Sequence, residues 1–253
     1  MDVHAHTHTP RKKWTHYFWE FLMLFLAVTI GFFVENQREH YVERNRAKEY
    51  AKALVEDLAK DTTEIFDVIR EDKLILTCFD SISSIIQKGI KNKMVPGSFY
   101  YYSTIGTAVA SVVWNNATLT QITQSGNLRY FTNPQLIKKI SLYYSISEYI
   151  SGLNTNDKRY REKSMDLRNR VLNNYLFARY SFYNVSGSIN VPDSLMNTLL
   201  PIQSYDVELL NEFANSFETR RSSLGVTVNK AFPIALKTAI ELMELLKKEY
   251  HLK

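Results

Sequence analysis

The longest apolar run in the chain lies near its beginning. Residues 17–34 read YFWEFLMLFLAVTIGFFV, and Glu20 is the only charged residue among them. A helix needs about 20 apolar residues to cross the hydrocarbon core of a bilayer, and a helix that starts at Trp14 has that length. The pattern therefore predicts one transmembrane helix over residues 14–34.

Aromatic residues gather at the start of this helix. Trp14, Tyr17 and Trp19 would lie where amphipathic rings favour the lipid headgroups. A cleavable signal peptide is the rival interpretation, with residues 11–13 as its basic region. No small-x-small cleavage site follows, because residues 35–38 read ENQR, so we expect the helix to be kept as a signal anchor.

The basic residues on the two sides of the anchor nearly balance. They form a tight cluster at residues 11–13, whereas those after residue 34 are interleaved with glutamates. Because positive residues favour the cytoplasmic side, the tight cluster favours a cytoplasmic tail over residues 1–13. The domain over residues 35–253 is then extracytoplasmic.

Glu20 carries the one ionisable group inside the apolar run. A carboxyl group in lipid is costly unless it is neutral, paired or close to the interface. His16 lies four residues earlier on the same helical face. Glu20 is therefore a proton-binding or subunit-pairing position, or it is a carboxylate that reaches the headgroups or His16. The second interpretation is the simpler one.

The anchor helix is expected to continue into the domain, over about residues 35–88, because no glycine or proline follows it directly. An apolar stripe with steps of three and four supports this helix: Ala51, Leu54, Leu58, Ile65 and Ile69, with Thr62 completing it. A similar face follows: Ile75, Cys78, Phe79, Ile82, Ile85 and Ile86. Residues 89–97, which contain two glycines and a proline, should end the helix.

A second long helix is predicted over about residues 134–182. Asn133 followed by Pro134 is a strong start signal. Two stripes follow: Leu136, Ile140, Tyr143, Ser147 and Ile150, and then Tyr160, Leu167, Val171 and Tyr175. Residues 152–157 are a candidate kink or interruption.

A third long helix is predicted over about residues 205–249, with the most regular period in the chain. Its stripe is Leu210, Phe213, Phe217, Leu224, Val228, Ala231, Ala235, Leu242 and Leu245. Pro233 should kink this helix because it removes one backbone donor.

Shorter elements fill the remaining segments. Residues 99–114 are expected to form short helices, and a helix capped by Asn116 should stop at Gly126. Residues 184–204 read as a loop with one short helix at 194–200. With only 8 Gly and 6 Pro in 253 residues, the chain is predicted to be all-α. The expected architecture is an elongated antiparallel helical bundle that continues from the transmembrane helix.

Two sequence segments resemble an uncharacterised single-span membrane protein family of the Bacteroidota. They are WEFLMLFLAVTIGFFVENQRE and ATLTQITQSGNLRYFTNPQLIKKISLYY. The resemblance is carried by Glu20, Gly31, Ser125, Gly126, Asn127, Leu128, Tyr143 and Tyr144. It implies an anchor in the bacterial inner membrane and a helical domain in the periplasm. Since that family has no assigned activity, the resemblance implies no catalytic residues.

The sequence offers few candidates for chemistry. His4, His6 and His8 form an HxHxH tract that could ligate a transition metal, but a partly protonated tail is the favoured interpretation, and we expect no cofactor. Cys78 lies on an apolar face without an adjacent histidine, which favours a core position over a nucleophile. The acidic pairs at residues 56–57 and 71–72 are expected on solvated helix faces.

One group of aromatic residues has two interpretations. Tyr100, Tyr101, Tyr102 and Trp114 could form a surface that binds a ligand or a partner, because aromatic rings with polar tips are enriched at interfaces. The alternative is that these rings pack inside one end of the bundle.

The sequence limits the possible functions mainly by arguing against certain classes of protein. The net charge of +5, from 31 basic and 26 acidic residues, is spread along the chain and does not favour nucleic acid. No catalytic constellation emerges, so we expect no enzyme. The expected function is to bind other membrane or envelope proteins, as a homo-oligomer or as an accessory subunit of a membrane complex. The alternatives are an extracytoplasmic sensory domain that acts through a partner and an oligomeric ion path that uses Glu20.

Overall fold

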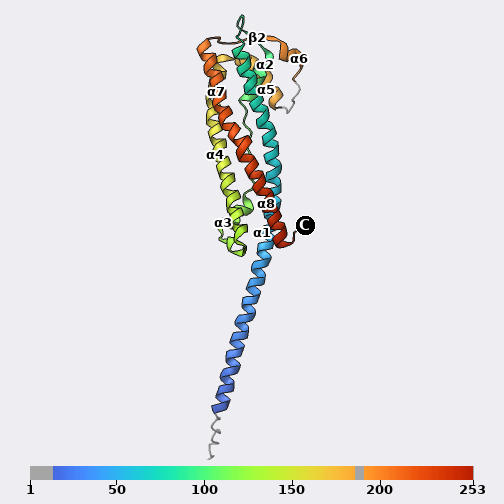
Figure 1. Cartoon of the computed structure of the whole chain (residues 1–253), viewed down its shortest axis with the longest axis vertical. Helices are drawn as coiled ribbons and strands as arrows, with labels where there is room; N and C mark the ends of the chain where they lie inside the picture. Colours follow the sequence, from blue (N-terminus) through green and yellow to red (C-terminus); the bar gives the residue numbers. More distant parts are fainter. Residues whose placement is uncertain (1–13, 186–190, 253) are drawn as a thin grey trace, which may run out of the picture. The chain divides into compact units, whose positions relative to one another are not determined.

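The computed structural model describes residues 14–185 and 191–252, and these residues are mostly helical (Figure 1). The predicted all-α class is therefore confirmed. The chain divides into two compact units, residues 1–49 and residues 50–253. Helix α1, Trp14–Gln87, has residues in both units, so the expected helix without a break is observed. The predicted tail over residues 1–13, with its histidine tract, lies outside the described residues.

In the first unit, the long apolar run of α1 is not buried by other parts of the protein. A window of 18 residues in this helix has a mean hydropathy of 2.0, and none of it is buried. By length and composition, α1 is the one helix among the described residues that could cross a membrane.

In the second unit, α1 contributes a row of core residues spaced alternately by three and four. We call this row the α1 seam, and none of its members is more than 5% exposed: Ala51, Leu54, Leu58, Asp61, Ile65, Val68, Asp72, Ile75, Phe79 and Ile82. Thr62 and Ile69 of the predicted stripe are only partly buried, although Ile69 still packs against the core. Asp61 and Val68 occupy those core positions instead.

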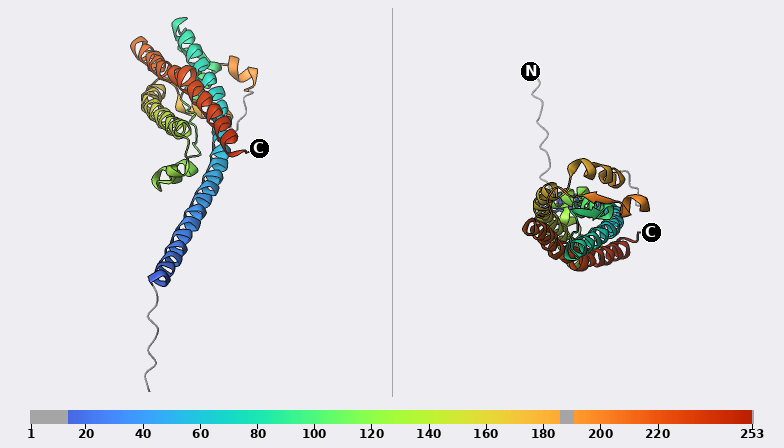
Figure 2. Two further views of the ribbon diagram at one scale, coloured as in Figure 1. Left: turned by 60° about the horizontal axis from the view of Figure 1, so that its bottom comes forward. Right: turned by 90° about the horizontal axis from the view of Figure 1, so that it is seen from above.

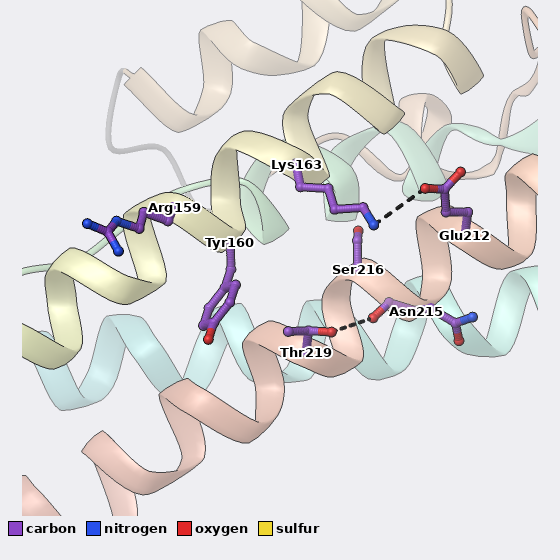
Figure 3. A pocket seen from close by; sticks show the side chains of 7 residues that line it. All are labelled: Arg159, Tyr160, Lys163, Glu212, Asn215, Ser216 and Thr219. Carbon is purple, nitrogen blue, oxygen red and sulfur yellow. Dashed lines mark hydrogen bonds and ion pairs between the residues drawn. The ribbon is translucent and has the colours of Figure 1, made fainter.

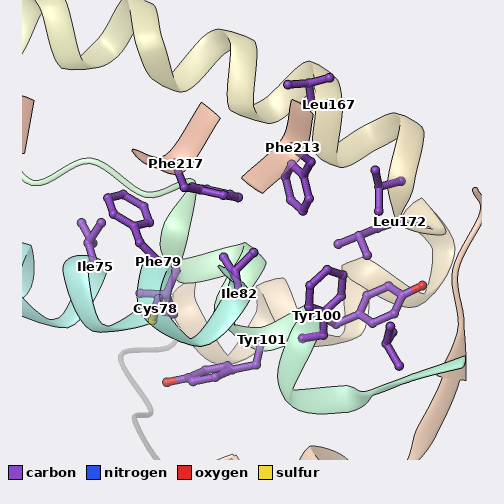
Figure 4. Packing of buried hydrophobic residues seen from close by; sticks show 14 of the residues in the cluster. Ile75, Cys78, Phe79, Ile82, Tyr100, Tyr101, Leu167, Leu172, Phe213 and Phe217 are labelled. Atoms are coloured by element: carbon purple, nitrogen blue, oxygen red, sulfur yellow. The ribbon is translucent and has the colours of Figure 1, made fainter. Parts of the chain in front are cut away.

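Three helices pack along this part of α1: α4 (Pro134–Val171), α7 (Val207–Val226) and α8 (Phe232–Tyr250). Figures 1 and 2 show α4 beside α7 and α8. An aromatic core joins α1 to α7, where the Phe79 and Phe217 rings lie 5.2 Å apart (Figure 4). A second apolar core joins α1, α4 and α8 through Leu54, Ile140 and Leu242. Each fully buried side chain of this kind contributes roughly 1.5–3 kcal/mol to folding.

The starts of the long helices follow local sequence signals. The Asn133 side chain accepts hydrogen bonds from the backbone N–H groups of Gln135 and Leu136, with Pro134 in the first helical position. The Asp206 side chain accepts from the Leu209 N–H at 2.8 Å and caps α7 in the same way. Both helix starts are thus set by short-range chemistry.

The predicted third helix is interrupted, although it does not end. A π-helical segment, η2 (Thr227–Ala231), connects α7 to α8. Pro233 follows directly, in the first turn of α8. Because proline has no N–H to donate to an earlier carbonyl, a change of helix type next to it is physically reasonable.

The predicted second helix was too long. It ends at Val171, and a separate helix, α5, runs from Asn174 to Val185. Leu172 adopts an extended backbone and is fully buried. The Asn173 side chain then accepts from the Tyr175 N–H at 2.9 Å, which starts α5. Tyr175, predicted on the apolar stripe, is 85% exposed, and residues 152–157 do not interrupt α4.

Short elements close one end of the second unit. Strands β1 (Met94–Pro96) and β2 (Leu199–Pro201) pair antiparallel, with Val95 opposite Leu200. No strand had been predicted, because each strand has only three residues. Helices α2 (Gly97–Gly106) and α6 (Asp193–Asn197) adjoin them. A Cβ at Gly97 would overlap the Leu195 carbonyl, so this contact requires glycine.

The remaining short helices agree with the predicted turn at Gly126, but the Asn116 side chain makes no cap hydrogen bond at the start of the first of them. Helix α3 runs from Ala117 to Gln124, and the 3-10 helix η1 from Asn127 to Tyr130. Gly126 lies between them with φ of 67°, a conformation that favours glycine.

Candidate functional site

The predicted anchor residues all lie on one helix of the first unit: Trp14, Tyr17, Trp19, Glu20 and Gly31. A Glu20 carboxylate oxygen lies 3.2 Å from the His16 Nε2 atom. This contact agrees with the simpler interpretation of Glu20, in which its carboxylate reaches His16.

The predicted aromatic surface is corrected by the structure. Tyr100 is fully buried and Tyr101 is 8% exposed, so neither ring forms an outer surface (Figure 4). The Tyr100 hydroxyl donates to the Pro201 carbonyl at 2.6 Å and accepts from the Asn173 N–H at 3.2 Å. The packing alternative therefore describes these two residues, because their rings help to close the end of the core.

Tyr102 and Trp114 are half-buried and lie in different surroundings. Tyr102 packs beside Tyr101, with ring centroids 5.8 Å apart. Trp114 packs edge-on against Tyr143, at 6.2 Å between centroids. The four predicted residues are thus not brought together.

A buried group of charges stands out in the interior instead. Arg220 on α7 is fully buried, and its guanidinium donates to both carboxylate oxygens of Asp157 on α4, at 2.9 and 2.7 Å. It also donates to the carbonyls of Gly106 and Ala108, at the end of α2. Bidentate pairs of this kind are strong and directional. Arg220 therefore holds α2 and α4 against α7.

Asp72 of the α1 seam lies close enough to this ion pair to feel its charges. Its side chain is 1% exposed, and its Oδ1 atom is buried without a hydrogen-bond partner. Burial, and then repulsion from Asp157, raise the pKa of Asp72 to about 8, although Arg220 acts in the opposite direction. The expectation that the acidic pair at 71–72 lies on a solvated face was wrong for Asp72. We call Asp72, Asp157 and Arg220 the charge centre.

Two further arginines of α4 hold the end of α2. The Arg161 Nε donates to the Thr107 carbonyl at 2.7 Å, and the Arg168 Nη1 donates to the Thr107 hydroxyl at 2.8 Å. Arg168 also lies 4.1 Å over the Phe177 ring. Burial and the nearby Arg161 lower the pKa of Arg168. Cations suit the negative end of a helix, so these contacts stabilise the C-terminus of α2.

A second buried carboxylate has very different surroundings. Asp61 accepts from the backbone N–H and the side-chain amide of Asn115, at 2.8 and 2.9 Å, and from the Tyr143 hydroxyl at 2.7 Å. Burial, and then the negative charge of Asp61, raise the pKa of Tyr143, so this hydroxyl remains a donor at neutral pH. The three hydrogen bonds account for the burial of Asp61.

A groove on the second unit lies between α4 and α7, with a volume of about 390 Å³. Figure 3 shows Lys163 directed toward Glu212, which it approaches to 3.4 Å, while Arg159 points away from both. The Thr219 hydroxyl donates to the Asn215 carbonyl at 3.2 Å. The charges that line this groove do not converge on one point, so the groove has no arrangement typical of catalysis.

Sequence reasoning missed the members of the charge centre, although a signal existed. A strict alternation of three and four from Leu58 leads through Asp61 and Asp72. The same alternation between Phe217 and Leu224 leads to Arg220. A charged residue at a seam position predicts a buried polar contact, because the helix geometry places it in the core.

Cys78 lies where the apolar pattern predicted, at 1% exposure. Burial raises the pKa of its thiol to about 12, so it is protonated at neutral pH. A scan against protein-family models and searches of curated proteins and of solved structures found no match to the chain.

Proposed function

We propose that this chain is a single-pass membrane protein of the bacterial envelope whose helical domain binds other protein chains. In this proposal residues 14–34 span the inner membrane, the tail is cytoplasmic, and residues 35–253 form a periplasmic antiparallel bundle. The partners are further copies of the chain or subunits of a membrane complex, and the role is non-catalytic.

The observation that carries the proposal is the uncovered apolar segment of α1. Its 18-residue window has a mean hydropathy of 2.0 with none of it buried. Side chains such as Leu24, Phe32 and Phe33 are 70, 76 and 63% exposed. A bilayer would remove this surface from water, at roughly 25 cal/mol per Å² of apolar area.

Binding to other chains is supported by an apolar row on the outer side of α4. Leu142, Tyr149 and Tyr160 are 48, 57 and 41% exposed. The half-buried Ile146 and Leu153, which also pack against the core, lie between them. The spacing from Leu142 to Leu153 alternates by four and three, as in helices that pack against another helix. We call these five residues the α4 outer row.

Cysteine cross-linking in native membranes tests the α4 outer row. Tyr149→Cys places a thiol in the row, and Ser141→Cys places one at an exposed position of the same helix outside it. The native Cys78 is buried, so it will contribute little background reaction. We expect a cross-linked product from the Tyr149→Cys variant and little from the Ser141→Cys variant. Equal cross-linking, or none, would contradict the proposed row.

The mass of the product separates the two kinds of partner. A product of twice the chain mass indicates a homo-oligomer, and any other mass indicates a different subunit. Gentle detergent extraction followed by mass spectrometry identifies that subunit. If the chain is extracted without detergent, the membrane proposal fails.

Protease treatment of intact spheroplasts tests the orientation. We expect the large domain to be digested, because it would lie outside the inner membrane. Full protection until the membrane is permeabilised would instead place the domain in the cytoplasm.

A further inference from the structure

Asp72 is a carboxyl group placed in the interior without a hydrogen-bond partner for its Oδ1 atom. The charged groups that act on it are Asp157 on α4, Arg220 on α7 and Glu71 on its own helix. A carboxylate at this place would lose its hydration and gain no hydrogen bonds at that atom. Such a charge is among the most unfavourable groups that a protein can bury.

Arg220 does not neutralise Asp72, because it is already paired with Asp157. Two of its nitrogen atoms donate to the Asp157 carboxylate, at 2.9 and 2.7 Å. Two nitrogen atoms also donate to the Gly106 and Ala108 carbonyls. With Asp72 ionised, two carboxylates would face one guanidinium, a net charge of −1. With Asp72 protonated, the charge centre is neutral.

We propose that Asp72 is a proton-binding site, and that loss of its proton loosens the packing of α1 against α4 and α7. The ligand is the proton, and the step is the ionisation of one carboxylic acid to a carboxylate, with the proton released to water. Hydration of the carboxylate requires that the three helices separate locally. The proposal is independent of the membrane anchor and of partner binding.

The direction of the pH dependence follows from the two states of the chain. The pKa of Asp72 is raised to about 8 in the folded protein, mainly by burial. In an unfolded chain an aspartate ionises with a pKa of about 3.9. Between these values the folded state holds a proton that the unfolded state has lost. Stability therefore falls as the pH rises from about 4 to about 8, and this contribution levels off above pH 8.

Proton release during unfolding tests the site in the full chain. Calorimetry of the chain in nanodiscs at pH 6.5, in buffers of different ionisation enthalpy, counts the protons released. We expect wild type to release about one proton more than Asp72→Asn. Asp166→Asn, which removes an exposed carboxyl on α4, should match wild type. Equal release from wild type and Asp72→Asn would overturn the proposal.

A measurement on the folded protein does not depend on whether Asp72→Asn folds. In the Glu20→Gln background, which removes the carboxyl inside the membrane segment, infrared spectra at pH 7 should show a protonated carboxylic acid. This band should disappear as the pH rises through about 8. Absence of the band at pH 7 would falsify the assignment of a proton to Asp72.

Asp157→Asn offers a second variant with a distinct outcome. It removes the repulsion from Asp157 while Asp72 stays buried, so we expect the pKa of Asp72 to fall and the infrared band to disappear at a lower pH than in wild type. A band that disappears at the same pH as in wild type contradicts the charge balance argued above.

Hydrogen exchange tests the link to packing. Backbone amides of α1 near Asp72 should lose protection between pH 7 and pH 9 in wild type, after correction for the intrinsic exchange rate. They should keep it in Asp72→Asn. Equal loss in both proteins would show that ionisation is not coupled to the packing of α1.

Discussion

Asp61 and Asp72 occupy equivalent positions on α1, but their carboxyl groups have different hydrogen-bond partners. Both lie on the α1 seam, and both are 1% exposed. Asp61 accepts three hydrogen bonds, from Asn115 and Tyr143, whereas the Oδ1 atom of Asp72 accepts none. A buried carboxylate with donors aimed at it can remain charged, but one without them favours the neutral acid. The comparison shows that two aspartates buried to the same extent can differ completely in the hydrogen bonds that they accept.

The largest expected effect comes from removing the guanidinium of the charge centre. Arg220→Leu leaves Asp157 buried without its partner and removes the positive charge near Asp72. Breaking a buried pair in this way costs about 3–5 kcal/mol. Denaturant unfolding of the full chain in detergent at pH 7 measures the loss.

Arg221→Leu is the matched control for this change. Arg221 lies next in sequence but is partly exposed, and it pairs with Asp80 and Glu218 at the surface. We expect it to cost less than about 1 kcal/mol. Similar losses for the two variants would mean that the charge centre does not stabilise the packing of α7.

The same substitution at the two aspartates should have opposite signs. Asp61→Asn places an amide where three donors converge, and hydrogen bonds to charged groups contribute roughly 1.5–3 kcal/mol each, so we expect a loss of at least about 2 kcal/mol at pH 7. Asp72→Asn removes only the tendency to ionise. It should match wild type near pH 4 and become more stable by a few kcal/mol at pH 8, since each pKa unit corresponds to about 1.4 kcal/mol.

Unfolding free energies measured from pH 4 to pH 9 decide this pair of predictions. If both substitutions change the free energy of unfolding in the same direction at pH 8, the two sites do not differ in the way predicted. A pH-independent difference between wild type and Asp72→Asn would show that Asp72 does not titrate in this range.

A smaller effect on stability is expected from removing the Tyr143 hydroxyl, which donates a hydrogen bond to Asp61. Tyr143→Phe removes one donor to this carboxylate but keeps the ring against Trp114. We expect a loss of about 1–2 kcal/mol, because Asp61 keeps the hydrogen bonds from Asn115. Tyr149→Phe, at a ring that is 57% exposed, should change stability by less than about 0.5 kcal/mol. Thermal unfolding of both variants provides the test, and equal shifts in Tm would argue against the Asp61 network.

The smallest effect is expected in the groove between α4 and α7. The Lys163 and Glu212 side chains are 65 and 47% exposed. Lys163→Ala should change the free energy of unfolding by no more than about 0.5 kcal/mol, because exposed ion pairs are screened by water and salt. A loss as large as that of Tyr143→Phe would mean that this surface pair contributes as much as a buried contact.

Local signals identified the helix starts and turns well. The Asn133 cap with Pro134 and the stop at Gly126 appear where expected. The break at Leu172 was missed, because a buried leucine in an extended conformation looks like part of an apolar helix stripe. The pairing of β1 with β2 was also missed, because it joins short segments about one hundred residues apart in sequence.

The candidate site was predicted less well than the fold. For the tyrosines at 100 and 101 the sequence left open a binding surface or packing inside the end of the bundle, and the structure buries them. Asp72 was expected on a solvated face, and the charges at positions 157 and 220 were overlooked. The spacing of three and four places Asp72 and Arg220 in the core. A sequence pattern can indicate that a charge is buried. It does not indicate which group will face it.

The sequence by itself determined the apolar segment near the beginning of the chain, the helix starts and the periodic seams, because these depend on neighbours within a few turns of helix. Only the tertiary structure determined which groups contact the buried carboxylates. Asp61 meets Asn115 and Tyr143, and Arg220 pairs with Asp157 and leaves Asp72 without its bidentate partner. These contacts join residues more than 50 positions apart, so packing of the folded chain determines which aspartate of the seam receives hydrogen bonds and which does not.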